Sequence, residues 1–269
     1  MQLIVNDFIM SYTDAGAGIP LLFIHGFPLN RHLWDPQVAG LADVARVLAP
    51  DLRGHGDSQP TPGAYTMDIF ADDLNSFLDE LGITQPVVVC GLSMGGYTAF
   101  AFYRKYSQRM AGLILTATRA AGDSPQKRDE RDAAAAKARN EGITVIIAGM
   151  LPKLFSSNTY IERPELTAQI TSIMKSTSVD GVVGDLSAMK GRQDSTGMLA
   201  EINIPTLVIH GVNDQIVPLD EARQMAAAIP NASLDIIPDA GHLPNLERPD
   251  LFNASICSFL ESIDQKVTK

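Results

Sequence analysis

The chain has 269 residues, enough for one sizeable α/β domain with an insertion or for two small domains. Its 31 acidic and 21 basic residues give a net charge of −10, so nucleic acids and anionic membranes are poor partners because both would repel it. No run approaches the roughly 18 apolar residues of a membrane span, and the amino terminus has no secretory pattern. Two cysteines, Cys90 and Cys257, cannot form a disulfide framework, so we expect a cytoplasmic protein.

Short β-rich runs alternate with longer helical patterns, which predicts a mostly parallel sheet covered by helices on both faces. The first two runs have no helix between them, so they predict an antiparallel hairpin at one edge. Strands are expected at residues 2–5, 9–13, 21–24, 46–49, 87–90, 112–115, 206–209 and 234–237. The main helices are expected at residues 66–81, 93–106, 220–228 and 249–263.

The segment between the sixth and seventh strands is about ninety residues long, far more than an ordinary crossover needs. Ser124 and Pro125 predict the start of a helix that Gly142 ends. Further helical patterns cover residues 143–155, 163–177 and 179–190. We therefore expect a core domain of residues 1–119 and 197–269, with a helical cap at 120–196. The cap methionines Met150, Met174 and Met189 could line a pocket, but most such residues pack into a core.

A serine lies in a glycine-rich turn between a predicted strand and a predicted helix. The segment Gly91-Leu92-Ser93-Met94-Gly95 follows the apolar run at residues 86–90 and precedes the helix. A serine at such a turn adopts strained backbone angles, and the flanking glycines remove side chains that would collide with neighbouring backbone. Because an ordinary serine is a poor nucleophile, exposure at such a turn matters only if a base lies beside it. The context favours Ser93 as a nucleophile.

Five histidines could supply that base: His25, His32, His55, His210 and His242. Only His242 follows the last predicted strand on a short loop, from which it could reach the serine turn. The other four have simpler interpretations as hydrogen-bonding or packing residues at strand ends and in loops. His242 is therefore the predicted base.

The acid that orients the base is predicted from the position of the seventh strand. Asp214 follows that strand, and the carboxyl ends of parallel strands face the same crevice. The loop after the sixth strand carries no carboxylate. Asp239 is expected to form a turn, and Asp220 and Glu221 suit the first turn of a helix. Asp214 is the predicted acid.

An acyl-transfer site also needs backbone donors for the developing oxyanion. The N–H groups of Met94 and Phe27 are the candidates, because the usual sources are the residue after the nucleophile and a loop after an earlier strand. Trp34, the sole tryptophan, could form a pocket wall or simply pack on the sheet. Met150 and Leu243 are the other candidates for substrate contact.

Five segments in this order are similar to the α/β-hydrolase superfamily: HGFP at 25–28, DLRGHGDS at 51–58, GLSMGG at 91–96, HGVNDQIVP at 210–218 and GHLPNLERP at 241–249. The chain most resembles its small carboxylesterases and 3-oxoadipate enol-lactonases, with likeness also to pimeloyl-ester carboxylesterases and cofactor-free haloperoxidases. Ser93, Asp214 and His242 match the superfamily's nucleophile, acid and base in chain order. Haloalkane dehalogenases and epoxide hydrolases of this superfamily have aspartate at the turn, so Ser93 disfavours both activities.

The resemblance implies hydrolysis of small-molecule carboxylic esters through an acyl-enzyme, with no metal or organic cofactor. A lactonase would use the same chemistry on a cyclic ester. A carbon–carbon bond hydrolase would need pocket residues that the sequence does not identify. A small-molecule receptor that retains the triad is a further alternative, and the sequence leaves the oligomeric state open.

Overall fold

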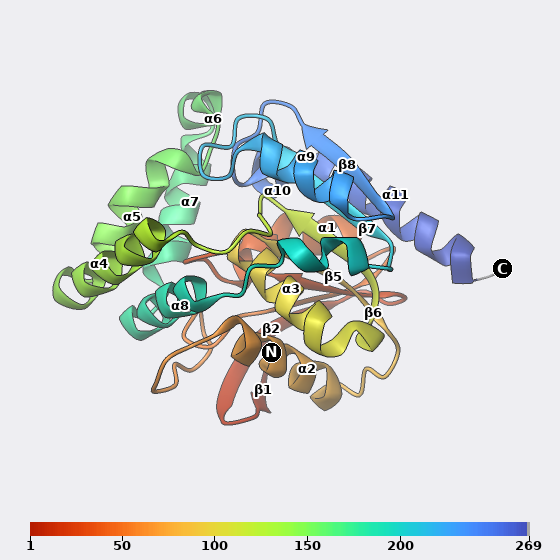
Figure 1. Ribbon diagram of the computed structural model, residues 1–269, viewed down its shortest axis with the longest axis horizontal. Coiled ribbons are helices and arrows are strands. Elements are labelled where there is room, and N and C mark those ends of the chain that lie inside the picture. Colours follow the sequence, from red (N-terminus) through yellow and green to blue (C-terminus); the bar gives the residue numbers. More distant parts are fainter. Residues whose placement is uncertain (268–269) are drawn as a thin grey trace.

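The computed structural model describes the backbone of residues 1–267 and the side chains of residues 1–263. Eight strands form one sheet in the order β1-β2-β4-β3-β5-β6-β7-β8 (Figure 1). The strands are β1 Gln2–Val5, β2 Phe8–Ala15, β3 Pro20–Ile24, β4 Arg46–Pro50, β5 Val87–Leu92, β6 Met110–Thr116, β7 Thr206–Gly211 and β8 Ala232–Ile237. Each predicted strand lies within one of these, and β1 and β2 pair as the predicted antiparallel edge hairpin.

Strands β3 to β8 are parallel, so their carboxyl ends meet at one edge of the sheet. The β2–β4 pair is antiparallel and joins the hairpin to this parallel sheet. Three of the carboxyl ends lead into the segments that carry the predicted site: β5 leads to residue 93, β7 to residue 214 and β8 to residue 242. The topology therefore brings these segments to the same edge.

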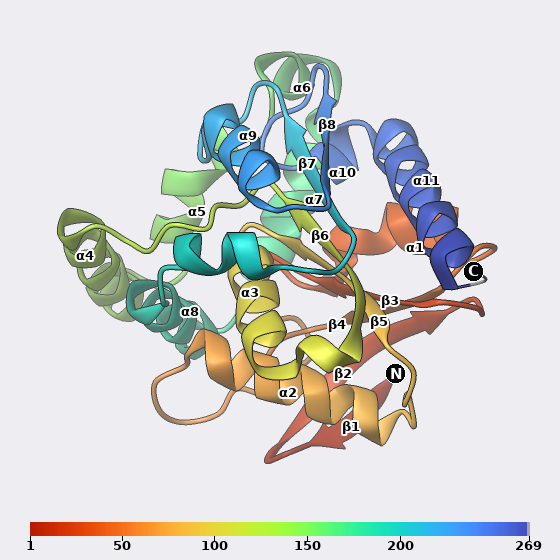
Figure 2. The same ribbon diagram turned by 45° about the vertical axis from the view of Figure 1, so that its right-hand side comes forward.

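Helices cover both faces of the sheet, as Figure 2 shows with α1 and α11 on one side and α2 and α3 on the other. The bounds are α1 Asp35–Leu41, α2 Met67–Glu80, α3 Met94–Tyr106, α9 Leu219–Ala228, α10 Pro244–Glu247 and α11 Pro249–Val267. Successive side chains of a strand point to opposite faces. In β5, Val87 and Val89 pack on the side of α2 and α3, whereas Val88 and Cys90 pack on the side of α1 and α11.

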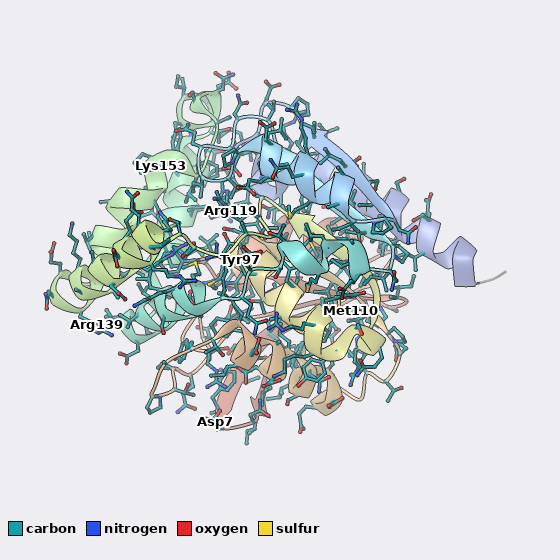
Figure 3. All side chains as sticks on the ribbon, in the orientation of Figure 1. Asp7, Tyr97, Met110, Arg119, Arg139 and Lys153 are labelled. Carbon is teal, nitrogen blue, oxygen red and sulfur yellow. The ribbon has the colours of Figure 1, made fainter. Side chains whose placement is uncertain are left out.

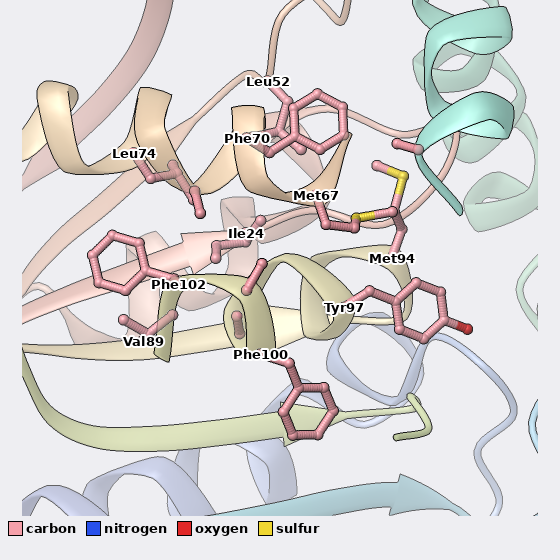
Figure 4. Close-up of a cluster of buried hydrophobic side chains, with 14 of the residues drawn as sticks. Ile24, Leu52, Met67, Phe70, Leu74, Val89, Met94, Tyr97, Phe100 and Phe102 are labelled. Atoms are coloured by element: carbon pink, nitrogen blue, oxygen red, sulfur yellow. The ribbon is translucent and has the colours of Figure 1, made fainter. Parts of the chain in front are cut away.

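A dense apolar cluster fixes α3, the helix that follows the serine turn. Ile24 and Val89 of the sheet pack against Met94 and Phe102 of α3, and α2 closes the cluster with Phe70 (Figure 4). Each of these side chains is fully buried. Truncating a buried side chain of this size lowers the free energy of unfolding by about 2–5 kcal/mol. Because any shift of α3 would disrupt several such contacts, the start of the helix is held firmly in place.

Five helices lie between β6 and β7 and are called here the helical insertion. They are α4 Pro125–Glu141, α5 Thr144–Met150, α6 Ser157–Glu162, α7 Pro164–Lys175 and α8 Val179–Gly191. All five gather on one side of the molecule, on the left and at the top in Figure 1. The Ser124 side chain accepts a hydrogen bond from the Lys127 N–H, and Gly142 ends α4 with φ +77°, as the sequence predicts. In the part of the chain described, no helix is long and apolar enough to cross a membrane.

Candidate active site

Ser93 occupies a strained turn between β5 and α3. Its backbone has φ +55° and ψ −112°, a combination that side chains other than glycine rarely adopt. The flanking glycines are required by space, since a Cβ on Gly91 would lie 2.2 Å from the Gly95 carbonyl oxygen. A Cβ on Gly95 would lie equally close to the carbonyl oxygen of Ile24. The two glycines therefore permit the sharp turn that holds Ser93 out of the sheet.

Two hydrogen bonds tie the turn to the end of strand β6 and to the loop that follows it. The Ser93 N–H donates to the Thr116 carbonyl at 2.9 Å, and the Thr118 hydroxyl donates to the Ser93 carbonyl at 2.8 Å. Ser93 itself is partly exposed and lines a cavity. Its hydroxyl has no hydrogen-bond partner within residues 1–263. The backbone is thus fixed while the hydroxyl stays available.

His242 and Asp214 form a buried pair at the same edge of the sheet. The Nδ1 atom of His242 lies 2.8 Å from Asp214 Oδ2, and an ionised carboxylate can only accept, so Nδ1 is the donor. The other carboxylate oxygen accepts N–H groups from Ile216 at 2.7 Å and Val217 at 3.0 Å. The backbone N–H of His242 donates to the Leu154 carbonyl at 2.9 Å. The histidine is therefore held by its ring and by its backbone.

The electrostatics of this pair favour an ionised acid. Burial alone would raise the pKa of Asp214, but the charge and hydrogen bond of His242 and the N–H groups of Val217 and Ile216 outweigh burial. The pKa of Asp214 therefore lies below its ordinary value. The Nε2 atom of His242 has no hydrogen-bond partner in the described part of the chain. No hydrogen bond joins it to Ser93 in this state, and such contacts often tighten only when substrate binds.

The two predicted oxyanion donors lie on either side of the serine turn. Met94 is the first residue of α3, where backbone N–H groups lack partners within the helix. Phe27 follows Gly26, and a Cβ on Gly26 would lie 3.3 Å from the Ser93 Cβ. Within residues 1–263, the Phe27 N–H has no hydrogen-bond acceptor. Both N–H groups are therefore free to receive an oxyanion.

Each of the remaining histidines has a partner other than Ser93. His25 accepts the Leu52 N–H at Nε2, and burial together with the charge of His55 lowers the pKa of His25 well below its ordinary value. His210 lies 2.9 Å from the Val217 carbonyl, and burial lowers the pKa of His210. The exposed His32 ring lies 3.1 Å from Asp35, and His55 contacts Asp185, as discussed below.

A cavity of about 590 Å³ opens beside Ser93 between the core and the helical insertion. Phe27, Met150 and Met189 line it. The predicted substrate contacts Trp34 and Leu243 do not line it, and both are fully buried in the same apolar cluster. The Trp34 ring packs on Phe23 and Phe252, with centroids 4.5 and 6.1 Å away, so the packing interpretation holds for it. Of the cap methionines, Met174 is fully buried, as expected for a core residue.

The lining also contains five basic side chains, which the sequence patterns did not predict. Four are spread over the helical insertion and the turns that follow its helices, and one lies three residues after the end of β6. They are Arg119, Lys127, Arg131, Lys153 and Arg192. Figure 3 shows Arg119 near the centre of the molecule and Lys153 on the insertion. No local motif links these positions, so only the fold reveals that they share a cavity.

The described residues contain no group of three or more His, Cys, Asp or Glu side chains that could hold a metal ion.

Residues 19–249 match the family model described as alpha/beta hydrolase fold. The chain belongs to the α/β-hydrolase family. This hydrolase has the family's eight-stranded, mostly parallel sheet with helices on both faces.

Three comparisons indicate which members this hydrolase is similar to. A solved thermophilic esterase from Thermogutta terrifontis, with malate bound, is 41% identical with a TM-score of 0.95, and 98% of each chain is covered. The solved enol-lactonase from Burkholderia xenovorans is 30% identical with a TM-score of 0.90, covering 97% of this chain and all of that one. A non-heme chloroperoxidase from Kitasatospora aureofaciens is 32% identical over 86% of this chain and 87% of its own.

Proposed function

We propose that this protein is a serine hydrolase that cleaves carboxylic esters of small molecules through an acyl-enzyme intermediate. The observation that carries the proposal is the state of His242, whose Nδ1 is engaged by Asp214 while Nε2 is left without a partner among the described residues. That arrangement suits a general base. A strained, partly exposed serine at the same edge of the sheet suits the nucleophile.

In the proposed reaction, Ser93 Oγ attacks the ester carbonyl and passes its proton to His242 Nε2. The negative charge that develops on the carbonyl oxygen is stabilised by the N–H groups of Phe27 and Met94. His242 then protonates the leaving alcohol, and Asp214 stabilises the imidazolium formed in between. A water molecule activated by His242 attacks the acyl-enzyme and releases the acid. Apart from the water molecule, each step uses only side chains and backbone N–H groups of this chain, with no metal or organic cofactor.

A lactonase activity is the second candidate, and similarity to the Burkholderia xenovorans enol-lactonase favours it. The chemistry is the same, since a lactone is a cyclic ester. The alcohol released by ring opening then stays attached to the acyl group. The cavity beside Ser93 would decide between open-chain and cyclic esters.

The helical insertion is proposed as the part that selects substrate. We assign residues 120–196 to a cap and residues 1–119 and 197–269 to the core, because Met150 and Met189 of the insertion line the cavity. The volume of the cavity, about 590 Å³, fits a small-molecule partner. Both cysteines are free, which agrees with the proposed cytoplasmic location.

A rate screen tests the proposal. Purified protein is assayed with 4-nitrophenyl esters of increasing acyl length and with a set of five- and six-membered lactones. We expect repeated turnover on at least one series, lost in the Ser93→Ala variant. Slow single turnover with a ligand that stays attached would instead support a receptor that retains the triad. Equal turnover by wild type and Ser93→Ala would reject the serine mechanism.

A further inference from the structure

The charge of the cavity is opposite to that of the protein as a whole. The chain carries 31 acidic and 21 basic residues, yet the cavity beside Ser93 is lined by five basic side chains and one carboxylate, that of Asp123. A wall of one sign raises the local concentration of ligands of the opposite sign. The lining of the cavity therefore favours anionic ligands, although the molecule as a whole is acidic.

Three of the five cations have partners that account for them structurally. Arg131 and Arg192 share Asp123, at 3.0 and 2.7 Å. Arg192 is almost completely buried, and its guanidinium stacks on Tyr97 at 4.1 Å from the ring centroid. Lys127 pairs with Glu130 one turn along α4 at 2.8 Å. These side chains hold the cavity wall together and contribute to its positive charge.

Arg119 and Lys153 are the two cations that remain available to a ligand. The Arg119 guanidinium donates to the Ile216 carbonyl at 3.0 Å and forms a long ion pair with Glu221 at 3.6 Å, a distance beyond that of a hydrogen bond. Donors of the guanidinium therefore stay free. Lys153 is exposed and forms no ion pair within 4.0 Å with any described residue.

Hydrogen bonds made by their chain neighbours link the segments of these two cations to Ser93 and His242. Arg119 directly follows Thr118, whose hydroxyl donates to the Ser93 carbonyl at 2.8 Å. Lys153 directly precedes Leu154, whose carbonyl accepts the His242 N–H at 2.9 Å. The backbone of one cation is thus held near the nucleophile and that of the other near the base. Both side chains line the same cavity as Ser93, so a ligand in that cavity can meet all three residues.

We infer that the substrate is an ester or lactone carrying its own carboxylate, and that Arg119 and Lys153 are the specificity-determining residues that bind this carboxylate. The inference rests on the proposed ester-hydrolase function and adds the substrate class. The carboxylate can belong to the acyl part or to the alcohol part. Both arrangements share the same recognition chemistry, and the substrate pairs below separate them.

The test measures kcat/KM for matched charged and neutral esters. For the acyl part, 4-nitrophenyl hemiglutarate is compared with 4-nitrophenyl pentanoate, which has the same chain length. For the alcohol part, 4-carboxyphenyl acetate is compared with 4-carbamoylphenyl acetate. Uncatalysed hydrolysis is subtracted in each case. We expect the wild type to prefer the charged member of one pair by about tenfold or more at low ionic strength, and about 0.5 M salt to reduce this preference.

The variants assign the preference to the named residues. Arg119→Gln is expected to lower the charged-to-neutral ratio by about tenfold, and the exposed Lys153→Gln by about threefold. Lys175→Gln on α7 removes the same charge from an exposed position outside the cavity, so it is the matched control and should leave the ratio unchanged. If Arg119→Gln does not fold, because the contact with Ile216 is lost, the result with Lys153→Gln decides.

The outcomes separate this inference from the proposed function. Turnover of the neutral esters with no preference in either pair, or a ratio that neither variant changes, overturns the inference and leaves the hydrolase proposal in place. No turnover of any ester overturns the proposed function. Calorimetric titration with glutarate then still tests the cation pair, which should bind glutarate more tightly in the wild type than in Lys153→Gln. Equal binding by the two proteins would reject the pair as an anion site.

Discussion

Two buried histidine–aspartate pairs in this molecule have nearly the same contact distance and opposite environments. His242 lies 2.8 Å from Asp214, and His55 Nε2 lies 2.7 Å from Asp185. In the first pair both carboxylate oxygens have partners, while histidine Nε2 has none among the described residues. In the second, both ring nitrogens face acceptors, since Nδ1 lies 3.1 Å from the Arg53 carbonyl, and Asp185 Oδ1 has no partner in the described part of the chain.

The same two residue types can therefore serve two purposes in one molecule. A general base needs a ring nitrogen that is free to take a proton, and His242 Nε2 is such a nitrogen. Both ring nitrogens of His55 are engaged, so the pair of His55 and Asp185 has no free nitrogen. It instead connects the loop after β4 to α8 of the helical insertion. The same junction is close-packed, because a Cβ on Gly181 would lie 2.3 Å from the Gly54 carbonyl oxygen. We therefore expect the first pair to control rate and the second to control stability.

The largest expected effect is on turnover in Asp214→Asn. The histidine loses its charge partner and the carboxylate that fixes its tautomer, so kcat should fall by about 10⁴-fold. Circular dichroism should show an intact fold. The matched control is Asp220→Asn at the exposed start of α9, which should keep the wild-type kcat. Full activity in Asp214→Asn would assign the acid to another residue.

The corresponding change in the other pair, Asp185→Asn, should act on stability. Removing one member of a buried pair leaves its partner uncompensated, so the free energy of unfolding should fall by about 3 kcal/mol. Urea denaturation measures this. The control is Asp132→Asn. This change removes the exposed ion pair between Asp132 of α4 and Lys190 of α8, whose charged atoms lie 2.6 Å apart, and it should lower the free energy of unfolding by less than about 1 kcal/mol. A loss of kcat in Asp185→Asn as large as in Asp214→Asn would end the distinction between the pairs.

The two pairs should also respond to pH in opposite windows. Burial alone would lower the pKa of His55, but Asp185 and the Arg53 carbonyl raise it above 6.5. The stability that this group contributes is full below pH 6.5 and is lost as pH rises through the folded-state pKa. The lowered pKa of Asp214 acts in reverse, so its contribution is present above 3.8 and is lost as pH falls through the folded-state pKa.

Denaturation curves across the pH range check this expectation. Asp185→Asn should flatten the decline in unfolding free energy above pH 6.5, and Asp214→Asn should flatten the decline below 3.8. Identical pH profiles for the two variants would show that the pairs are electrostatically equivalent.

The smallest expected effect concerns the strain at Ser93. Because φ is +55°, Ser93→Gly should raise the free energy of unfolding by about 1 kcal/mol relative to Ser93→Ala, which keeps a Cβ and also lacks the hydroxyl. Thermal denaturation of the two variants measures the difference. Equal stability would mean that the turn imposes no backbone strain.

The sequence predicts the sheet well because the signal for each strand comes from a run of consecutive residues. Each predicted strand lies inside an observed one, and where an end extends beyond the prediction it does so by one or two residues, as neighbouring strands continue the pairing. β2, for example, runs on through Asp14, whose polar side chain gives no strand signal but pairs with Arg46 at 2.7 Å. The short helices α6 and α10 were not predicted, since six and four residues show too little periodicity.

In the candidate site, too, the sequence predicts the features that depend on local patterns and misses those that depend on residues distant in the chain. The positions of Ser93, Asp214 and His242 follow from local turns after strands, which sequence patterns describe. The surroundings of Trp34 depend on Phe23 and Phe252, which are distant in sequence, so the choice between pocket wall and core needed the fold. The basic lining of the cavity and the pairing of His55 with Asp185 likewise join remote segments, and no local signal announces them.

We propose Ser93 as the nucleophile that the pair of His242 and Asp214 serves. Covalent labelling with a phosphonate ester, located by peptide mass spectrometry, tests this assignment. We expect a single adduct on Ser93 in the wild type and in Asp185→Asn, much slower labelling in Asp214→Asn, and none in Ser93→Ala. An adduct on another serine in the wild-type protein, or labelling of Asp214→Asn at the wild-type rate, would contradict it.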